Sequence, residues 1–296
     1  MNISLEALQV IDTIARKGSF AAAANALFRV PSAITYNVRK LEDELGVKIF
    51  NRDGHKAILT PAGEELLAQG RTLLQAASEL EMRVKRRASG VETELNIAVG
   101  DAIQMHTIWN LLDGFYKQNF GTHIKITQEV LGGVWDALLF GRADIVIGAP
   151  GESPTNQGIS TKSIGMMRFV FVVSPHHPLA RLPEPLQNLD ILQYRSVVAA
   201  DTSRNLIPRT TGVLSGQDIL SVASLQDKMQ AQVAGLGVGY LPEHMAAPMI
   251  ASGKLVVKQV ATAKPDTAMY IGWRSQDEGK AISWWIKQAQ QTAFLE

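Results

Sequence analysis

The segment at residues 18–44, GSFAAAANALFRVPSAITYNVRKLEDE, constrains the fold of this chain most, because it holds two short helical patterns separated by a tight break. The first pattern follows Ser19, a residue type suited to cap a helix N-terminus. The second begins with Pro31, which the first helical turn tolerates because its missing N–H needs no partner there. Its apolar stripe consists of Ile34, Val38, Leu41 and Leu45. This arrangement predicts a helix-turn-helix, whose second helix enters the major groove of DNA.

The opposite face of the second helical pattern carries side chains that can reach phosphates or base edges. These are Ser32, Thr35, Tyr36, Arg39 and Lys40. A surface helical hairpin with a solvated polar face fits the same periodicity, so the pattern alone leaves both interpretations open.

A small β-ribbon, or wing, is expected at residues 47–59, where two short apolar runs flank a polar tip. The tip carries Arg52, His55 and Lys56. A wing beside a recognition helix usually contacts the DNA backbone or minor groove, so these residues are further DNA-binding candidates. Basic residues at a hairpin tip are also ordinary solubilising groups.

A long helix is predicted from residue 61 to about residue 89. One of its faces repeats at intervals of four and three residues, which is the heptad seam that faces a partner helix in a coiled coil. The seam residues are Leu66, Gly70, Leu73, Ala77, Leu80 and Val84. A second copy of the same helix would cover this stripe, so the seam predicts dimerisation.

From residue 94 onwards, strand and helix patterns alternate, which indicates α/β structure with parallel strands. Strands are expected at residues 95–99, 124–127, 145–147, 169–173, 196–199, 255–257 and 269–273. Helices are expected at about 105–118, 134–140, 225–234 and 280–292. The first three strands and the last one form one sheet in this interpretation, and the middle group forms another. The chain then crosses between two lobes twice, near residues 163–166 and 265–268.

Ligands of such folds bind at the carboxyl ends of strands, so three loops point to a crevice between the lobes: 100–106, 131–136 and 201–205. Gly132 and Gly133 precede a helix whose free N–H groups could hold a carboxylate or nitro oxygen. The candidate wall residues are Asp101, Gln104, Gly132, Gly133, Trp135, Thr202, Ser203 and Tyr240. Each of them also has an ordinary structural interpretation, such as a turn cap for a polar residue or a core position for Trp135.

Composition excludes several classes of protein. The chain of 296 residues has no cysteine, which excludes disulfides and thiolate chemistry and suits a reducing cytosol. The N-terminus is amphipathic rather than continuously apolar, and no run of about 18 apolar residues occurs, so neither a signal peptide nor a membrane span is expected. The net charge is only +1.

Several motifs occur in a fixed order along the chain. The block GSFAAAANAL…VPSAITYNVRKLEDELGVKIFNRDG…LTPAG spans residues 18–63, and FGRADIVIG, SPHHPLA and AGLGVGYLP follow at residues 140–148, 174–180 and 234–242. In these motifs the chain resembles the LysR-type transcriptional regulators, and the resemblance covers essentially all of its residues. Two further segments, RVPSAITY and ADTSR, resemble one branch of that family. The chain departs from the family at the recognition helix, where Val30, Pro31 and Ser32 replace Ser-Gln-Pro and Tyr36 replaces the usual arginine. We therefore expect base preference to come from Ser32, Thr35 and Tyr36, with Arg39 and Arg52 on phosphates.

The resemblance implies a fold, a set of partners and a function. The fold class is an α/β effector module of two Rossmann-like lobes, similar to periplasmic binding proteins, plus an N-terminal all-α winged helix-turn-helix joined by a long linker helix. The domains are a DNA-binding domain at 1–60, a linker and dimerisation helix at 61–89 and an effector-binding domain at 92–296, with lobe I at about 92–163 and 268–296 and lobe II at about 164–267. The partners are double-stranded DNA with an interrupted palindromic operator, a small anionic or aromatic inducer, further copies of the chain in a homodimer or homotetramer, and RNA polymerase. The implied function is cytoplasmic, sequence-specific transcription regulation controlled by the inducer, without a cofactor.

Motifs of enzymes and metal sites are weak in this sequence. His176 and His177 are adjacent, so their side chains diverge, and no third metal ligand is spaced nearby. The glycines at 235, 237 and 239 do not match the spacing of a dinucleotide site, and neither a nucleophile elbow nor a Walker pattern occurs. We therefore expect no enzyme activity. A two-lobed solute-binding protein is the main alternative, and the N-terminal helix-turn-helix argues against it.

Overall fold

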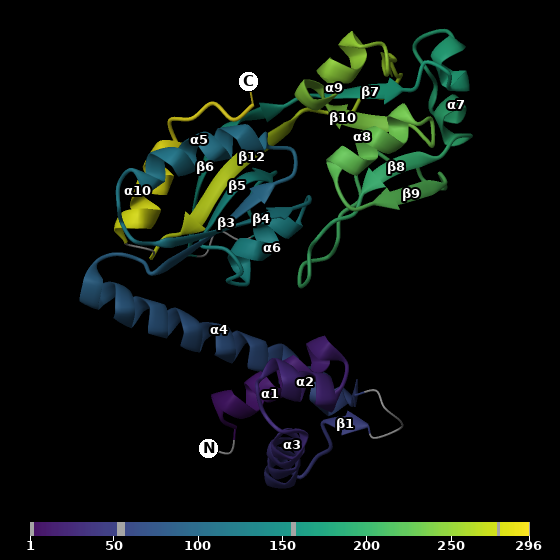
Figure 1. Ribbon diagram of the computed structural model, residues 1–296. Helices are drawn as coiled ribbons and strands as arrows, with labels where there is room; N and C mark the ends of the chain where they lie inside the picture. The colour runs from purple at the N-terminus through teal and green to yellow at the C-terminus, as the bar shows by residue number, and fades with distance from the viewer. Residues whose placement is uncertain (1–2, 52–56, 155–157, 277–278, 296) are drawn as a thin grey trace. The chain divides into compact units, whose positions relative to one another are not determined.

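The computed structural model describes residues 3–51, 57–154, 158–276 and 279–295 (Figure 1). The chain divides into two compact units, Met1–Arg87 and Ala88–Glu296. No helix within the described residues is long and apolar enough to span a membrane.

Three helices surround the apolar core of the N-terminal unit: α1 (Leu5–Lys17), α2 (Phe20–Ala26) and α3 (Pro31–Leu45). The side chains of Ser4 and Ser19 accept hydrogen bonds from the first-turn N–H groups of α1 and α2. These bonds satisfy donors that a helix N-terminus leaves without partners. The predicted helix pair is confirmed, and the stripe residues Ile34, Val38 and Leu41 of α3 are buried in the core.

The turn between α2 and α3 is a Schellman motif. The N–H groups of Phe28 and Arg29 donate to the carbonyl oxygens of Asn25 and Ala24, at 3.3 and 2.9 Å. Phe28 takes the left-handed position of this motif, with φ of 53°, and its side chain is 98% exposed. Glycine is the usual residue there, because a Cβ atom crowds the backbone when φ is positive. The turn therefore holds a strained aromatic residue that gains almost no burial.

The predicted wing and linker helix are also present. Strand β1 (Phe50–Asn51) pairs antiparallel with β2 (Ile58–Leu59), and α4 (Pro61–Ser89) follows. A Cβ atom added to Gly63 would lie 2.2 Å from the carbonyl oxygen of Ile49, so this glycine lets α4 start directly against the wing.

The first lobe of the C-terminal unit is built on a five-stranded sheet in the order β4-β3-β5-β12-β6. Its strands are β3 (Glu94–Gly100), β4 (His123–Glu129), β5 (Ile145–Pro150), β6 (Ile159–Met167) and β12 (Thr267–Arg274). Strand β3 runs parallel to β4 and β5, whereas β12 is antiparallel to β5 and β6. The sheet is mixed rather than wholly parallel, because β12 returns from the second lobe in the opposite direction.

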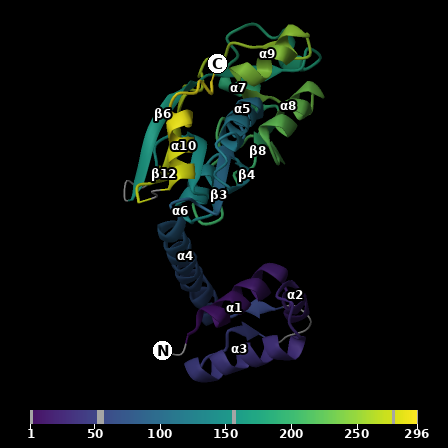
Figure 2. The same cartoon turned by 60° about the vertical axis from the view of Figure 1, so that its left-hand side comes forward.

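Helices cover both faces of this sheet. Two of them, α5 (Met105–Tyr116) and α10 (Lys280–Ala289), lie side by side over one face in both views (Figures 1 and 2). The alternate strand residues Leu95, Ile97 and Val99 belong to the core on that side. Ala98 of the same strand faces α6 (Gly133–Leu139) on the other side. This alternation is the period of two that a strand imposes on its side chains.

The second lobe contains two small sheets linked by an isolated bridge, rather than the single sheet that the sequence predicts for the middle group of strands. One sheet has the order β10-β7-β11, and the other pairs β8 with β9 in parallel. Its strands are β7 (Phe169–Val173), β8 (Ser196–Ala199), β9 (Ile219–Val222), β10 (Gly239–Pro242) and β11 (Val256–Val257). Its helices are α7 (Asn188–Leu192), α8 (Leu225–Val233), α9 (Glu243–Ala251) and the 3-10 turn η1 (Pro178–Arg181). An isolated bridge between Ser196 and Val238 links the two sheets.

The chain crosses between the lobes twice, the first time just after the predicted residues 163–166 and the second time near the predicted residues 265–268. Strand β6 ends at Met167 and β7 begins at Phe169, while β12 begins at Thr267 after the chain leaves the second lobe. These two crossing strands pair with each other, with Thr267 opposite Met167. Every predicted strand and long helix is confirmed, whereas β6, β9, β10, α7 and α9 were not predicted.

Candidate nucleic-acid interface and ligand pocket

The exposed face of α3 carries the residues predicted to contact DNA. Ser32, Tyr36, Arg39 and Lys40 are exposed, and Tyr36 retains 66% of its accessible surface. Thr35 is partly buried, and its hydroxyl donates to the carbonyl oxygen of Pro31 at 3.0 Å. Since that hydroxyl proton is used within the helix, Thr35 presents an acceptor oxygen and a methyl group to a ligand.

The buried carboxylate of Glu42 joins the wing to α3. It accepts the backbone N–H groups of Ile49 and Phe50, at 2.9 and 3.4 Å, and the ammonium of Lys48 at 2.8 Å. Burial opposes ionisation, but these hydrogen bonds and the Lys48 charge outweigh it and hold the pKa of Glu42 below its ordinary value. The predicted contacts Arg52, His55 and Lys56 lie outside the described residues.

The six seam residues of α4 have different environments. Leu66 packs against the core of the N-terminal unit, and a Cβ atom on Gly70 would lie 2.8 Å from Leu8 of α1. Leu73, Leu80 and Val84 are each more than half exposed, and Ala77 is partly exposed. The N-terminal part of the seam is therefore used within the unit, and dimerisation through the remainder stays a prediction.

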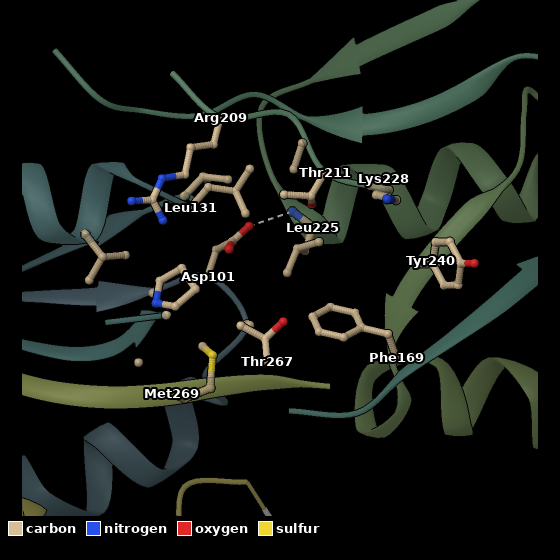
Figure 3. Close-up of a pocket in the computed structure, with 18 of the residues that line it drawn as sticks. Asp101, Leu131, Phe169, Arg209, Thr211, Leu225, Lys228, Tyr240, Thr267 and Met269 are labelled. Atoms are coloured by element: carbon tan, nitrogen blue, oxygen red, sulfur yellow. Dashed lines mark hydrogen bonds between the residues drawn. The ribbon is translucent and has the colours of Figure 1, made fainter. Parts of the chain in front are cut away.

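A cavity of about 190 Å³ lies between the two lobes (Figure 3). The first lobe contributes the loop after β3, including Asp101, and the start of β12, with Thr267 and Met269. The second lobe contributes Phe169, Tyr240 and the cationic residues Arg209, Lys228 and Lys264. Two of the eight predicted wall residues, Asp101 and Tyr240, line this cavity.

Charged side chains in this cavity are partly withdrawn from water. Asp101 accepts the backbone N–H of Leu225, at the start of α8, at 2.9 Å across the lobes, and burial raises the pKa of Asp101 to about 6. Burial, together with the neighbouring Lys264 charge, lowers the pKa of Lys228 to about 7. The Lys264 ammonium lies 3.5 Å from the centre of the Phe169 ring, and burial lowers the pKa of Lys264 to about 8. Within the described residues, neither lysine has a carboxylate at ion-pair distance.

The other six predicted wall residues lie away from the cavity. Gln104 precedes α5, and Trp135 is fully buried in the core, with its indole N–H donating to the carbonyl oxygen of Gly151 at 3.2 Å. Gly132, Gly133, Thr202 and Ser203 meet each other in a contact between the lobes. The predicted loops 131–136 and 201–205 therefore lie together, but they contact each other instead of a ligand.

Asp201 occupies the place where a ligand carboxylate was expected. Its carboxylate accepts the N–H groups of Gly132 and Gly133 at 3.0 and 3.1 Å, and also those of Ser203 and Arg209 at 2.7 and 2.8 Å. Burial opposes ionisation, but these bonds hold the pKa of Asp201 below its ordinary value. An internal carboxylate thus satisfies the N–H groups at the start of α6.

Asp136 completes the contact, which we call the inter-lobe clasp (Gly132, Gly133, Asp136 and residues 201–206). The carboxylate of Asp136 is fully buried and accepts the N–H groups of Arg204, Asn205 and Leu206 at 3.2, 2.7 and 2.8 Å. The guanidinium of Arg142 pairs with Asp136 at 2.9 Å and also with Glu129. Thr202 donates to Glu129 and accepts the N–H of Val130.

The two lysines of the cavity, Lys228 and Lys264, were not among the predicted wall residues. The only sequence signal for Lys228 is its place in an otherwise ordinary helical pattern, and Lys264 lies just before the predicted crossing. The two histidines carry no metal-like geometry: His177 is buried, its Nδ1 accepts the N–H of Leu179 at 3.2 Å, and burial lowers its pKa. In the part of the chain that the structure describes, no group of three or more metal-ligating side chains occurs.

The winged helix-turn-helix and the two-lobed α/β module define a class of DNA-binding regulators that carry a ligand-binding domain. Residues 5–64 match the family "Bacterial regulatory helix-turn-helix protein, lysR family", and residues 88–293 match "LysR substrate binding domain". The chain belongs to the LysR family of transcriptional regulators.

Known relatives extend along the whole chain. The chain is 38% identical to the HTH-type transcriptional regulator YeeY of Escherichia coli K12 over 281 residues, which cover 95% of this chain and 91% of YeeY. It is 39% identical to the probable HTH-type transcriptional regulator YhaJ of the same strain over 287 residues, covering 97% and 95%. The segments RVPSAITY and ADTSR indicated the branch of the family that YhaJ typifies. The similarity to YhaJ along the chain confirms this branch resemblance. The fold is similar to full-length CbnR in complex with its target DNA, with a TM-score of 0.59, 18% identity and coverage of 98% and 99%. These relatives are regulators rather than plain solute-binding proteins.

Proposed function

We propose that this regulator binds an interrupted palindromic operator through α3 and the wing, and that a small anionic molecule in the cavity between the lobes controls it. The observation that carries the proposal is a pair of lysines in the small cavity, the buried Lys228 and the partly buried Lys264, neither of which has a carboxylate at ion-pair distance among the described residues. A buried charge without a partner is costly, and a bound anion removes that cost. An aromatic ring on the ligand would pack beside Phe169 and Tyr240.

The face of α3 divides by chemistry into two roles. Ser32, Thr35 and Tyr36 read base edges: the acceptor oxygen of Thr35 suits an amino group of adenine or cytosine, and its methyl suits a thymine methyl. Arg39 and Lys40 bind phosphates, as do Arg52, His55 and Lys56 of the wing.

An assembly of two or four copies would present two such faces to one operator. The exposed seam residues Leu73, Ala77, Leu80 and Val84 of α4 form the dimer contact in this proposal. The family suggests a cytoplasmic location and RNA polymerase as a downstream partner. The inducer can change DNA binding only through its differential affinity for two arrangements of the protein.

Lys228→Met tests the sensor directly, with Lys254→Met as a matched control, because Lys254 is an exposed lysine of the same lobe. A thermal-shift screen of small acids identifies stabilising ligands, since a ligand that binds only the folded state raises the unfolding temperature. We expect Lys228→Met to lose this shift and Lys254→Met to retain it, while both bind DNA like the parent protein in gel shifts. An unchanged ligand shift in Lys228→Met would remove the cavity from the proposal.

A further inference from the structure

The cationic groups of the inter-lobe cavity are distributed over two ends. Figure 3 shows Arg209 on the side of Leu131 and Asp101, and Lys228 on the opposite side with Phe169 and Tyr240. Lys264 belongs to the second end, because its ammonium lies over the Phe169 ring at 3.5 Å. The lining also includes apolar side chains, among them those of Leu131, Leu225 and Met269.

The charges in the cavity do not balance. Three cationic side chains line the cavity with one carboxylate, that of Asp101, which leaves a formal excess of two positive charges. Of the three, Lys228 is buried, Lys264 is partly buried and Arg209 is exposed. Asp101 is also committed within the protein, because it accepts the N–H of Leu225 at 2.9 Å. In the described part of the chain, no carboxylate lies at ion-pair distance from Arg209, Lys228 or Lys264.

The two ends suit the same ligand group in different ways. A guanidinium binds a carboxylate through two parallel N–H···O bonds, whereas ammonium groups act as point charges that can share one carboxylate. The cavity volume of about 190 Å³ is below the roughly 300–1,000 Å³ of pockets for drug-sized ligands, so the ligand must be small.

We infer that the inducer is a small dicarboxylate, with one carboxylate on Arg209, the other on Lys228 and Lys264, and a short apolar spacer between them. This inference rests on the proposed function and specifies the ligand class of the same site. A monocarboxylate would leave one cationic end unpaired, and a neutral ligand would leave both.

Binding of a dicarboxylate should also take up a proton. Lys228 faces Lys264 and Asp101, and burial with the Lys264 charge lowers its pKa to about 7, so it is largely neutral at pH 8. A bound carboxylate favours the ammonium form and raises that pKa again. Calorimetry at pH 8 in two buffers of different ionisation enthalpy measures this uptake.

The test compares glutarate with its monomethyl ester, and phthalate with benzoate, by calorimetry on the full chain. We expect each diacid to bind on the order of 10- to 100-fold more tightly than its monoacid, because each lost contact involves a charge-assisted hydrogen bond. Arg209→Gln and Lys228→Met should each remove this preference. Lys228→Met should also reduce the proton uptake to the part that Lys264 contributes, because burial lowers the pKa of Lys264 to about 8. Lys254→Met serves as the control that retains both.

Two results would overturn the dicarboxylate inference while the proposed sensor stands. One is equal affinity for diacids and monoacids with binding still lost in Lys228→Met. The other is stabilisation by neutral compounds alone, again lost in Lys228→Met. Failure of the proposed function has a different signature, in which ligands bind equally well to the parent, Lys228→Met and Arg209→Gln proteins.

Discussion

Asp136→Asn perturbs the inter-lobe clasp with almost no change in side-chain volume. The carboxylate of Asp136 is fully buried, accepts three backbone N–H groups from residues 204–206 and pairs with Arg142. The amide retains one acceptor oxygen but brings an NH₂ group toward donors. It leaves Arg142 with Glu129 as its remaining carboxylate partner and with the carbonyl oxygen of Gly133. Removing one member of a buried ion pair typically costs about 3–5 kcal/mol, and the retained oxygen favours the lower end of that range.

Tryptophan fluorescence during urea unfolding measures the loss of stability in the C-terminal unit, which contains the inter-lobe clasp. All five tryptophans, Trp109, Trp135, Trp273, Trp284 and Trp285, belong to the C-terminal unit, so the signal reports that unit alone. With an m-value of about 2 kcal/mol/M, a loss of about 3 kcal/mol lowers the urea midpoint by about 1.5 M. Asp190→Asn is the control: Asp190 accepts a single backbone N–H, that of Gln187, in the capping box of α7, and its loss should cost about 1 kcal/mol.

The effect of Asp136→Asn should depend on pH with a defined sign. Burial alone would raise the pKa of Asp136, but the Leu206 N–H and the Arg142 guanidinium outweigh it and hold the pKa below the ordinary 3.8. A depressed pKa contributes stability that is complete above the unfolded-state pKa and is lost as pH falls through the folded-state value. The difference between parent and variant should be constant between pH 7 and pH 5 and shrink below about pH 4. An unchanged midpoint at pH 7 would refute the reasoning.

Three further predictions concern the N-terminal unit. Phe28→Gly should stabilise the N-terminal unit by about 1 kcal/mol, because glycine adopts the left-handed conformation of this turn without strain. The gain should appear as slower amide exchange in α1–α3. Faster exchange would show that the Phe28 side chain stabilises the unit. Ala77→Glu should place like charges in the exposed seam and weaken both dimerisation and DNA affinity, and unchanged sedimentation across a concentration series would contradict the seam. Glu42→Gln should lower the stability of the wing by about 1–3 kcal/mol at pH 7, and the deficit should begin to shrink as pH falls below 4.5, the ordinary pKa of the group, because the pKa of Glu42 is lowered in the folded state. Equal protection of the Ile49 and Phe50 amides in parent and variant at pH 7 would contradict this prediction.

Local signals predicted the N-terminal unit well, because its helix boundaries depend on nearby residues. Ser4 and Ser19 cap the helices that follow them, and Gly18 and Gly46 end helices with positive φ. Strands β9 and β10 were missed because each is short and its pairing depends on distant segments. The strained turn at Phe28 has no sequence signal, since glycine is the residue that marks this conformation.

The candidate site was predicted only in part, as the contact between Gly132 and Asp201 illustrates. The sequence indicates a helix start at Gly132 and Gly133 and polar residues in the loop after β8, and both are present. Only the tertiary fold shows that Asp201 from that loop takes the N–H groups of Gly132 and Gly133, so that they bind no external anion. Lys228 and Lys264 were missed because isolated lysines are usually exposed, and their burial results from the packing of two lobes.

The measurement that tests the account most directly is selection of DNA sites from random sequence by the full-length parent, Tyr36→Ala and Arg39→Ala proteins, followed by affinity measurements at several salt concentrations. The account predicts that the parent selects an interrupted palindrome and that Tyr36→Ala alters the selected bases, with a loss of about 1–3 kcal/mol at the cognate base. Arg39→Ala should select the same sequence, bind it more weakly and reduce the salt slope by about one. Selection of the same bases by Tyr36→Ala and the parent, with equal affinity, would contradict the assignment of α3 as the element that reads DNA.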